Sequence, residues 1–287
     1  MADSYLECLT REFEISGAGS GAGPDTVYIG GGTPTVLTEN RLQRLMEIVL
    51  SAISGKTPAE WSVEVSPDTL SRKKLDILMS AGVNRVSMGA QSFDEQALIA
   101  MGRRHNRKQI FDGIETMRKN GMENIGVDLI ASIPGVTDKS WRENLNICAS
   151  LKIPHISVYS LTIEEGTVLR DRIDNGSLAV KNERDQLDDL SAAESILTLV
   201  GYRRYEISNY SLPGYECGHN MACWRGDDYA GFGPGASGRE GLARWTNVPD
   251  LKKYIDAIFS GAEKGRASRK FFPPGMIFER ECFSASE

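Results

Sequence analysis

The chain has 287 residues, of which 40% are hydrophobic and 25% are charged, and this balance is typical of a folded globular protein. No apolar run approaches the ~20 residues that a membrane-spanning helix needs. The net charge of −6 argues against a broad nucleic-acid-binding surface. The first residues lack a signal-peptide pattern, and five cysteines are too few for a secreted disulfide framework. We therefore expect a cytoplasmic protein that does not bind nucleic acid.

Strands and helices are predicted to alternate as far as residue 161. Ser4 and Glu7 form a capping box that predicts an opening helix, and a glycine-rich loop follows at residues 17–24. Short apolar runs predict strands at residues 25–29, 61–65, 85–88, 125–130 and 155–161. Apolar periodicity and capping residues predict helices at residues 39–53, 71–81, 106–121 and 139–150, with a short helix after Ser92. This order predicts βαβ units and a parallel sheet, and it fits a doubly wound sheet and an open barrel equally well.

The pattern changes after residue 161. A charged amphipathic helix is predicted at residues 182–200, and a shorter helix at residues 250–259. Between them, a segment rich in Tyr, Trp and Gly is expected to form short strands and tight turns. We therefore predict three parts. They are an α/β unit at residues 1–170, a smaller α+β segment at 171–260 and an irregular tail at 261–287.

Polar residues follow the predicted strands at the positions where α/β proteins place their binding sites. Residues 30–33, three glycines and a threonine, come directly after the first strand, and glycine lets the backbone approach a ligand closely. Glu64, Gln91 and Asp128 lie at or near the ends of the next three strands. Each feature alone is also compatible with a tight turn or a structural hydrogen bond. Their convergence on one edge of the sheet predicts a shared pocket.

Two further groups are candidates for ligand binding. Arg103 could hold a carboxylate in a bidentate manner, although surface solvation also explains an arginine there. His219 lies between Cys217 and Cys223, but a zinc site would need a second ligand pair, which the sequence lacks. An axial haem ligand and a hydrogen-bonded turn histidine both remain open for His219. Motifs of serine hydrolases and of P-loop nucleotide hydrolases are absent from the sequence.

Five motifs in order resemble the radical SAM family that contains the oxygen-independent coproporphyrinogen III oxidases and the HemW haem chaperones. They are GGGTP at residues 30–34, EVSP at 64–67, RVSMGAQSF at 85–93, GRRH at 102–105 and VDLI at 127–130. The resemblance implies a partial (β/α)₆ barrel that binds S-adenosylmethionine (SAM) and a [4Fe–4S] cluster. It implies that the residues contacting SAM are Gly31, Gly32, Thr33, Glu64, Gln91, Arg103 and Asp128. The last three match family positions that hold a second SAM or the substrate in the oxidases.

The later segment resembles the chaperone branch of this family. Residues 219–224, HNMACW, are similar to the His-Asn-x-x-Tyr-Trp motif of the chaperones, with Cys223 at the tyrosine position. The resemblance implies that His219 contacts haem and that the protein passes haem to an acceptor protein, with a membrane-associated protein as one candidate. The alternative is a coproporphyrinogen III oxidase, which performs a SAM-dependent oxidative decarboxylation in porphyrin biosynthesis.

The sequence departs from the family at its start. The family places a Cys-x₃-Cys-x₂-Cys motif after a first barrel strand and before the opening helix, whereas here the sequence starts with that helix. We therefore expect a barrel without its first strand and without cluster ligands, from a chain truncated at both ends. Such a chain should perform no radical chemistry and should be marginally stable, because a missing strand exposes a sheet edge.

Overall fold

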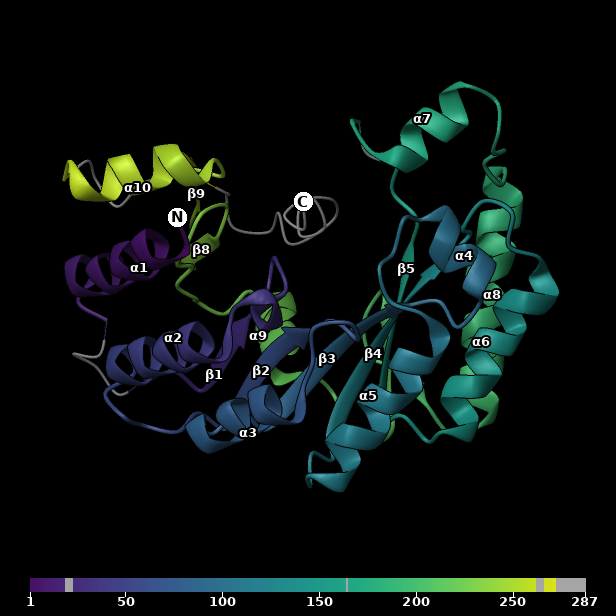
Figure 1. Cartoon of the computed structure of the whole chain (residues 1–287), viewed down its shortest axis with the longest axis horizontal. Helices are drawn as coiled ribbons and strands as arrows, with labels where there is room; N and C mark the ends of the chain where they lie inside the picture. Colours follow the sequence, from purple (N-terminus) through teal and green to yellow (C-terminus); the bar gives the residue numbers. More distant parts are fainter. Residues whose placement is uncertain (19–22, 164, 262–265, 272–287) are drawn as a thin grey trace. The chain divides into compact units, whose positions relative to one another are not determined.

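The computed structural model describes residues 1–18, 23–163, 165–261 and 266–271, and the chain divides into two compact units (Figure 1). The first unit contains Met1–Trp61, Ile77–Val83 and Cys217–Glu287. The second contains Ser62–Asp76 and Asn84–Glu216. Within the described ranges, no helix is both long and apolar enough to cross a membrane.

The main sheet has seven strands in the order β1-β2-β3-β4-β5-β7-β6. Their bounds are β1 (Thr26–Ile29), β2 (Glu60–Val65), β3 (Arg85–Gln91), β4 (Asn124–Ala131), β5 (His155–Ser160), β6 (Arg203–Arg204) and β7 (Asn209–Ser211). Strands β2 to β5 pair in parallel, whereas β7 pairs antiparallel with both β5 and β6. The predicted α/β class and parallel sheet are confirmed. The partial barrel stays a prediction.

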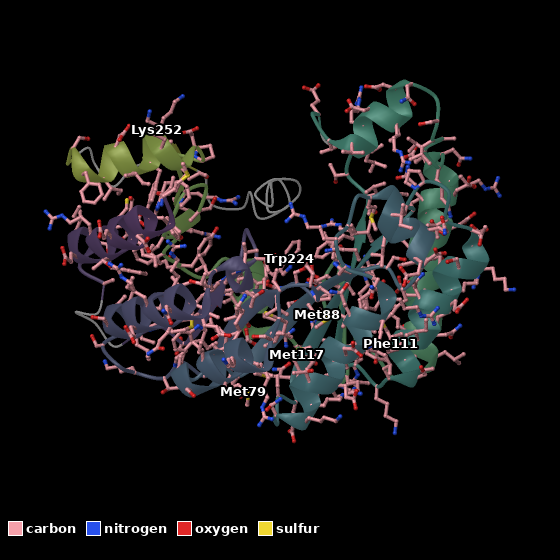
Figure 2. The ribbon with its side chains drawn as sticks, in the orientation of Figure 1. Met79, Met88, Phe111, Met117, Trp224 and Lys252 are labelled. Carbon is pink, nitrogen blue, oxygen red and sulfur yellow. The ribbon has the colours of Figure 1, made fainter. Side chains whose placement is uncertain are left out.

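The second unit also contains helices. They are α4 (Glu95–Ala100), α5 (Arg107–Lys119), α6 (Asp138–Ser150), α7 (Val168–Asp174) and α8 (Glu183–Leu199), and α3 (Arg72–Ala81) is shared between the units. Asn106 starts α5 and Asn182 starts α8, as the sequence predicts, and Asn106 and Gln109 form a reciprocal capping box at α5. Met88 of β3 and Met117 of α5, labelled in Figure 2, are both fully buried. A Cβ atom at Gly113 would lie 2.6 Å from Cε of Met88, so a larger residue there would require the Met88 side chain to move.

The first unit joins the two ends of the described chain. Its helices are α1 (Ala2–Ser16), α2 (Glu39–Ala52), α9 (Gly218–Arg225) and α10 (Leu251–Phe259), with a 3₁₀ turn, η1 (Pro34–Val36). A small antiparallel sheet has the order β10-β9-β8, formed by β8 (Ser237–Glu240), β9 (Ala243–Asn247) and β10 (Arg266–Phe271). Helix α1 packs against both α2 and α10 (Figure 1).

A buried carboxylate holds the first unit together. Glu12 of α1 is only 4% exposed. It accepts hydrogen bonds from Tyr254 Oη at 2.6 Å, the Gly233 amide at 2.8 Å and Asn247 Nδ2 at 2.9 Å. Because a buried charge is costly unless it is hydrogen-bonded, these three donors fix α1 against β9, α10 and the turn at Gly233.

Three segments differ from the sequence prediction. Residues 218–225 form a helix instead of a strand or turn, because Glu60 supplies the cap that the local sequence lacks. Helix α7 was not predicted, since its seven residues are too few for a clear period. Residues 266–271 form a strand in the segment predicted to be irregular, because pairing with β9 satisfies their backbone. The predicted domain limits stay a prediction.

Candidate functional site

One face of the sheet in the second unit is polar. Parallel pairing aligns Glu64 with Ser87, and it aligns Asp128 with Gly89 on one side and Ser157 on the other. Their side chains therefore point to the same face of the sheet. The alternate residues of the same strands are apolar and buried: Val63, Val65, Val86, Met88, Ile125, Val127, Leu129, Ile156 and Val158. Glu64 and Asp128 are thus members of a continuous polar face, and not isolated charges inside apolar strands.

Asp128 lies in the middle of this polar face. Ser87 Oγ donates to its two carboxylate oxygens at 3.0 and 3.2 Å, and Ser157 also hydrogen-bonds it. Burial nevertheless raises the pKa of Asp128, although these hydrogen bonds and the charge of Arg85 oppose the rise. Burial and the nearby charge of Asp128 raise the pKa of Tyr159 as well. The fold therefore keeps a carboxylate in a place that does not favour its charge.

Gln91 joins the polar face through an unusual backbone conformation. Its backbone φ angle is +65°, a value that residues other than glycine rarely adopt. The register between β3 and β4 shifts between Gly89 and Gln91. A Cβ atom at Gly89 would lie 2.9 Å from Nε2 of Gln91, so the amide folds back over this glycine. Gly89 pairs with Asp128, and the structure therefore brings Gln91, Asp128 and Glu64 to one face of the sheet, whereas their predicted contact with SAM stays a prediction.

Arg103 lies in the turn between α4 and α5 and is exposed. Its amide donates to the Leu98 carbonyl oxygen at 2.9 Å, which closes the end of α4. The neighbouring His105 is buried, with Nε2 3.0 Å from the Ala90 carbonyl oxygen. Arg103 lies in the second unit, as do Glu64 and Asp128. Its predicted contact with a ligand stays a prediction.

The predicted glycine turn lies in the first unit, directly after β1. Gly31 has a φ of +79°, which favours glycine. A Cβ atom at Gly31 or Gly32 would meet nothing within 4 Å, so both positions face open space. Thr33 precedes η1, and its carbonyl oxygen accepts the amide of Val36 at 3.0 Å. The turn therefore presents accessible backbone, as a ligand-binding loop requires.

His219 also lies in the first unit, in the first turn of α9, and β1 holds its ring in place. Thr26 Oγ1 is 3.0 Å from Nδ1. The ring stacks on Tyr28 with centroids 5.2 Å apart. Burial lowers the pKa of His219, and the charge of Glu60 opposes this change only in part. The contacts with β1 therefore fix the orientation of the imidazole, and its burial favours the neutral form.

Glu60 fixes the start of α9. Its carboxylate accepts the amides of Gly218 at 2.8 Å and His219 at 3.1 Å, and Cys217 Sγ lies at 3.3 Å. These amides are donors that a helix leaves unsatisfied in its first turn, and a negative charge there also favours the helix dipole. Trp224, labelled in Figure 2, lies near the other end of α9 and is partly exposed.

Sequence reasoning missed several residues that hold the predicted ones. They are Thr26, Tyr28 and Glu60 around His219, and Ser87, Ser157 and Tyr159 around Asp128. The spacing of most of them is a signal, because residues two apart in a strand share a face of the sheet. Thr26 and Tyr28 have this spacing, and so do Ser157 and Tyr159. Nothing local indicates that Glu60 caps a helix 158 residues away.

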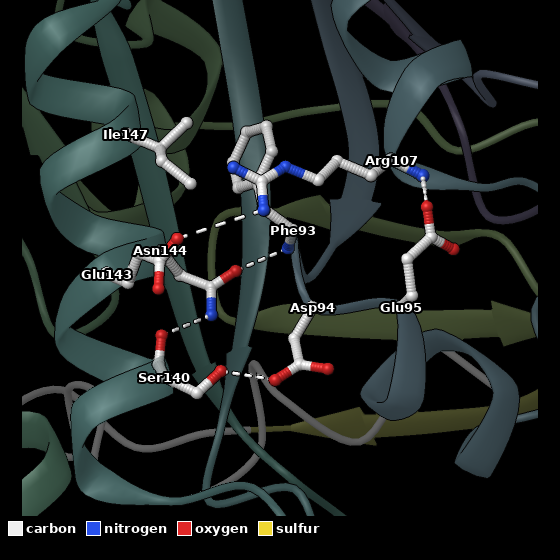
Figure 3. Close-up of a pocket in the computed structure, with 8 residues that line it drawn as sticks. All are labelled: Phe93, Asp94, Glu95, Arg107, Ser140, Glu143, Asn144 and Ile147. Atoms are coloured by element: carbon white, nitrogen blue, oxygen red, sulfur yellow. Dashed lines mark hydrogen bonds and ion pairs between the residues drawn. The ribbon is translucent and has the colours of Figure 1, made fainter.

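Two of the pockets in the second unit lie beside α4, one of them against α5 and α6 and the other against α7. Figure 3 shows the smaller one, of about 140 Å³, which is lined by Phe93, Asp94, Glu95, Arg107, Ser140, Glu143, Asn144 and Ile147. Its polar groups bind one another: Asn144 accepts the Phe93 amide, and Glu95 accepts the Arg107 amide at 2.9 Å. The other, of about 270 Å³, is lined partly by α4 and α7. Neither pocket is lined by a predicted site residue.

Comparisons with known proteins define the class. The Radical SAM superfamily model matches residues 14–148. The solved coproporphyrinogen III oxidase HemN from Escherichia coli, a radical SAM enzyme, aligns with a TM-score of 0.82 at 24% identity, over 95% of this chain and 65% of that one. The archaeal Elp3 of Methanocaldococcus infernus aligns with a TM-score of 0.56 over 68% of this chain and 50% of that one. The fold is therefore that of the radical SAM proteins.

Sequence relatives define the family. The chain is 40% identical to the heme chaperone HemW of Bacillus subtilis (strain 168), over 92% of this chain and 69% of that protein. It is 36% identical to HemW of Lactococcus lactis, over 89% of this chain and 66% of that protein. It is 33% identical to HemW of Escherichia coli (strain K12), over 83% of this chain and 62% of that protein. The chain belongs to the HemW family of radical SAM proteins, and it spans about two thirds of the length of these relatives.

Proposed function

We propose that this chain binds haem through His219 and passes it to an acceptor protein, and the relatives named heme chaperone support this proposal. The observation that carries the proposal is the exposure of His219, together with the contact that holds its ring at Nδ1. The sequence contains three histidines. His105 and His155 are 5% and 2% exposed, and each binds a protein oxygen through Nε2. His219 alone is partly exposed, and its Nδ1 is the nitrogen held by Thr26.

This arrangement suits iron binding. A histidine that ligates a metal usually has its other ring nitrogen in a hydrogen bond, which fixes the tautomer and the ring orientation. Thr26 supplies that bond at Nδ1 of His219, and stacking on Tyr28 limits ring rotation. Burial favours the neutral imidazole, and in the tautomer whose Nδ1–H donates to Thr26 Oγ1, Nε2 has a lone pair for the iron of haem.

We further propose that this chain binds SAM through the residues that the sequence predicts. The turn at Gly31, Gly32 and Thr33, where a Cβ atom at either glycine would meet nothing within 4 Å, leaves room for the methionine end of SAM. On the polar face, the oxygens of Glu64 and Asp128 suit ribose hydroxyls or the ammonium group, and the amide of Gln91 can donate or accept. The residues proposed to contact SAM are Gly31, Gly32, Thr33, Glu64, Gln91, Arg103 and Asp128.

The described residues do not fit a [4Fe–4S] cluster. In the part of the chain that the structure describes, no three His, Cys, Asp or Glu side chains gather in a way that could hold a metal ion. Such a cluster normally needs four cysteine thiolates. We therefore derive no radical step for this chain.

Haem titration tests the proposal. Ferrous haem, kept reduced with dithionite, is added to the purified chain and to His219→Ala, and binding is followed by the Soret band. We expect the variant to lose affinity by more than about tenfold, because loss of a residue that merely orients a metal ligand already costs about 10–100-fold. His105→Gln is the matched control, since glutamine can still bind the Ala90 carbonyl oxygen.

Three results would contradict the haem proposal. The first is a wild-type chain that gives no Soret shift. The second is a His219→Ala variant that binds haem as the wild type does. The third is SAM-dependent decarboxylation of coproporphyrinogen III by this chain, which would favour the oxidase alternative. Transfer is tested separately, by mixing the haem-loaded chain with a haem-free cytochrome and following the Soret band of the cytochrome.

A further inference from the structure

Cys223 is placed beside the imidazole of His219. The two residues are one helical turn apart on α9, at positions i and i+4, so their side chains lie on the same face. Sγ of Cys223 is 3.9 Å from Nε2 of His219. Cys223 is a reduced, partly exposed cysteine. The nitrogen proposed to bind iron therefore has a second strong iron donor next to it.

These two donors cannot serve the same haem iron together. The axial positions of haem lie on opposite sides of the porphyrin plane, whereas both donors belong to one helix face. Only one of them can bond the iron from that side at a time. Their short separation means that a small sliding of the haem, or rotation of the Cys223 side chain about χ1, exchanges one for the other.

We propose that Cys223 and His219 are alternative axial ligands of the bound haem, with the thiolate on ferric iron and the imidazole on ferrous iron. The proposal rests on the haem-binding function proposed above. When ferric haem binds, the thiol releases its proton to solvent and the Fe–S bond forms. When a one-electron reductant converts ferric to ferrous iron, the Fe–S bond breaks, sulfur takes a proton from solvent, and Nε2 of His219 bonds the iron.

Charge explains the preference. An anionic thiolate is attracted more strongly to the more positive ferric ion, and a metal-bound thiol is deprotonated outright. The neutral imidazole of His219 gains less from the extra iron charge, so its relative advantage rises after reduction. The oxidation state of the haem would then decide which of the two side chains holds it.

Spectroscopy of haem-loaded variants tests this proposal. Ferric complexes are examined by electron paramagnetic resonance and absorption, and again after reduction with dithionite. The wild type should show a thiolate-ligated ferric signal that is replaced by a histidine-ligated ferrous spectrum. Cys223→Ser should lose the thiolate signal and show histidine ligation in both states. Cys148→Ala, which removes a thiol from the core of the second unit, should match the wild type.

His219→Ala completes the test. It should keep the ferric thiolate signal, because Cys223 remains, and should lose the histidine-ligated ferrous spectrum. If the wild type and Cys223→Ser give identical ferric spectra that His219→Ala abolishes, the alternative-ligand proposal is wrong and haem binding by His219 stands. If the wild type binds no haem, both proposals are wrong.

Discussion

Glu60 should be the residue on which helix α9 depends most. The helix has eight residues, which is too short for stability on its own. Its N-cap residue, Cys217, makes no side-chain capping bond. Glu60 replaces that cap from strand β2, by accepting the amides of Gly218 and His219. Replacing Glu60 with alanine should therefore release the start of α9 and with it the imidazole of His219.

The expected cost follows from the bonds lost. Loss of a capping acceptor costs about 1 kcal/mol, and loss of a negative charge near the first turn costs about 0.3–1 kcal/mol, or up to ~2 kcal/mol where the site is partly buried. Together these give about 2 kcal/mol for Glu60→Ala. Glu60→Gln keeps one carbonyl acceptor but removes the charge, so about 1 kcal/mol is expected. With a urea m-value of about 2 kcal/mol/M, the alanine variant should lower the unfolding midpoint by about 1 M.

Urea unfolding followed by tryptophan fluorescence measures this effect. Three of the four tryptophans, Trp61, Trp224 and Trp245, lie in the first unit, so the signal reports mainly on that unit. Glu47→Ala is the matched control, because Glu47 is an exposed carboxylate on α2 and its loss should change stability by less than about 0.5 kcal/mol. Equal midpoints for Glu60→Ala and Glu47→Ala would refute the capping argument.

Three further predictions follow from buried ionisable groups. Burial lowers the pKa of His155 and His219 below 6.5, so the unfolded chain binds more protons than the folded chain does. The free energy of unfolding should therefore be highest above about pH 6.5 and fall at lower pH. A urea midpoint that stays constant from pH 8 to 5 would contradict this. Burial raises the pKa of Asp128, so Asp128→Asn should not lower the free energy of unfolding at pH 7. The same variant should weaken SAM binding by about tenfold, because it removes a proposed SAM contact, and a thermal shift assay with added SAM measures this. Tyr254→Phe removes a donor to buried Glu12 and should cost about 1.5–3 kcal/mol in urea unfolding, whereas a cost below 0.5 kcal/mol would show that the bond is unimportant.

Local signals predicted most of the fold. Helices α5 and α8 begin at the asparagines that the sequence predicts, Asn106 and Asn182, because capping acts within one turn. Strands β4 and β5 likewise fall within one residue of their predicted limits. Non-local contacts decided the differences. Residues 266–271 form a strand only by pairing with β9, and no period in the sequence indicates this.

The polar face of the sheet could have been predicted more fully than it was. In residues 85–90 and 125–129, polar or small residues alternate strictly with apolar ones, which is the pattern of strands with two different faces. When Asp128 is considered alone, as a charge in an apolar strand, its partners Ser87 and Ser157 on the neighbouring strands are not identified. The φ angle of Gln91 was not predictable, since it follows from the register shift between β3 and β4.

The haem motif itself carries only part of the proposed site. Residues 219–224 supply the imidazole and the adjacent thiol, but β1 supplies the partner of Nδ1 and the stacking ring, and β2 supplies the carboxylate that starts the helix. Each of these strands is short, and Thr26, Tyr28 and Glu60 resemble ordinary strand residues in the sequence. A peptide containing only the motif would lack the Thr26 contact, the stacking ring and the cap, and should bind haem more weakly than the folded first unit does.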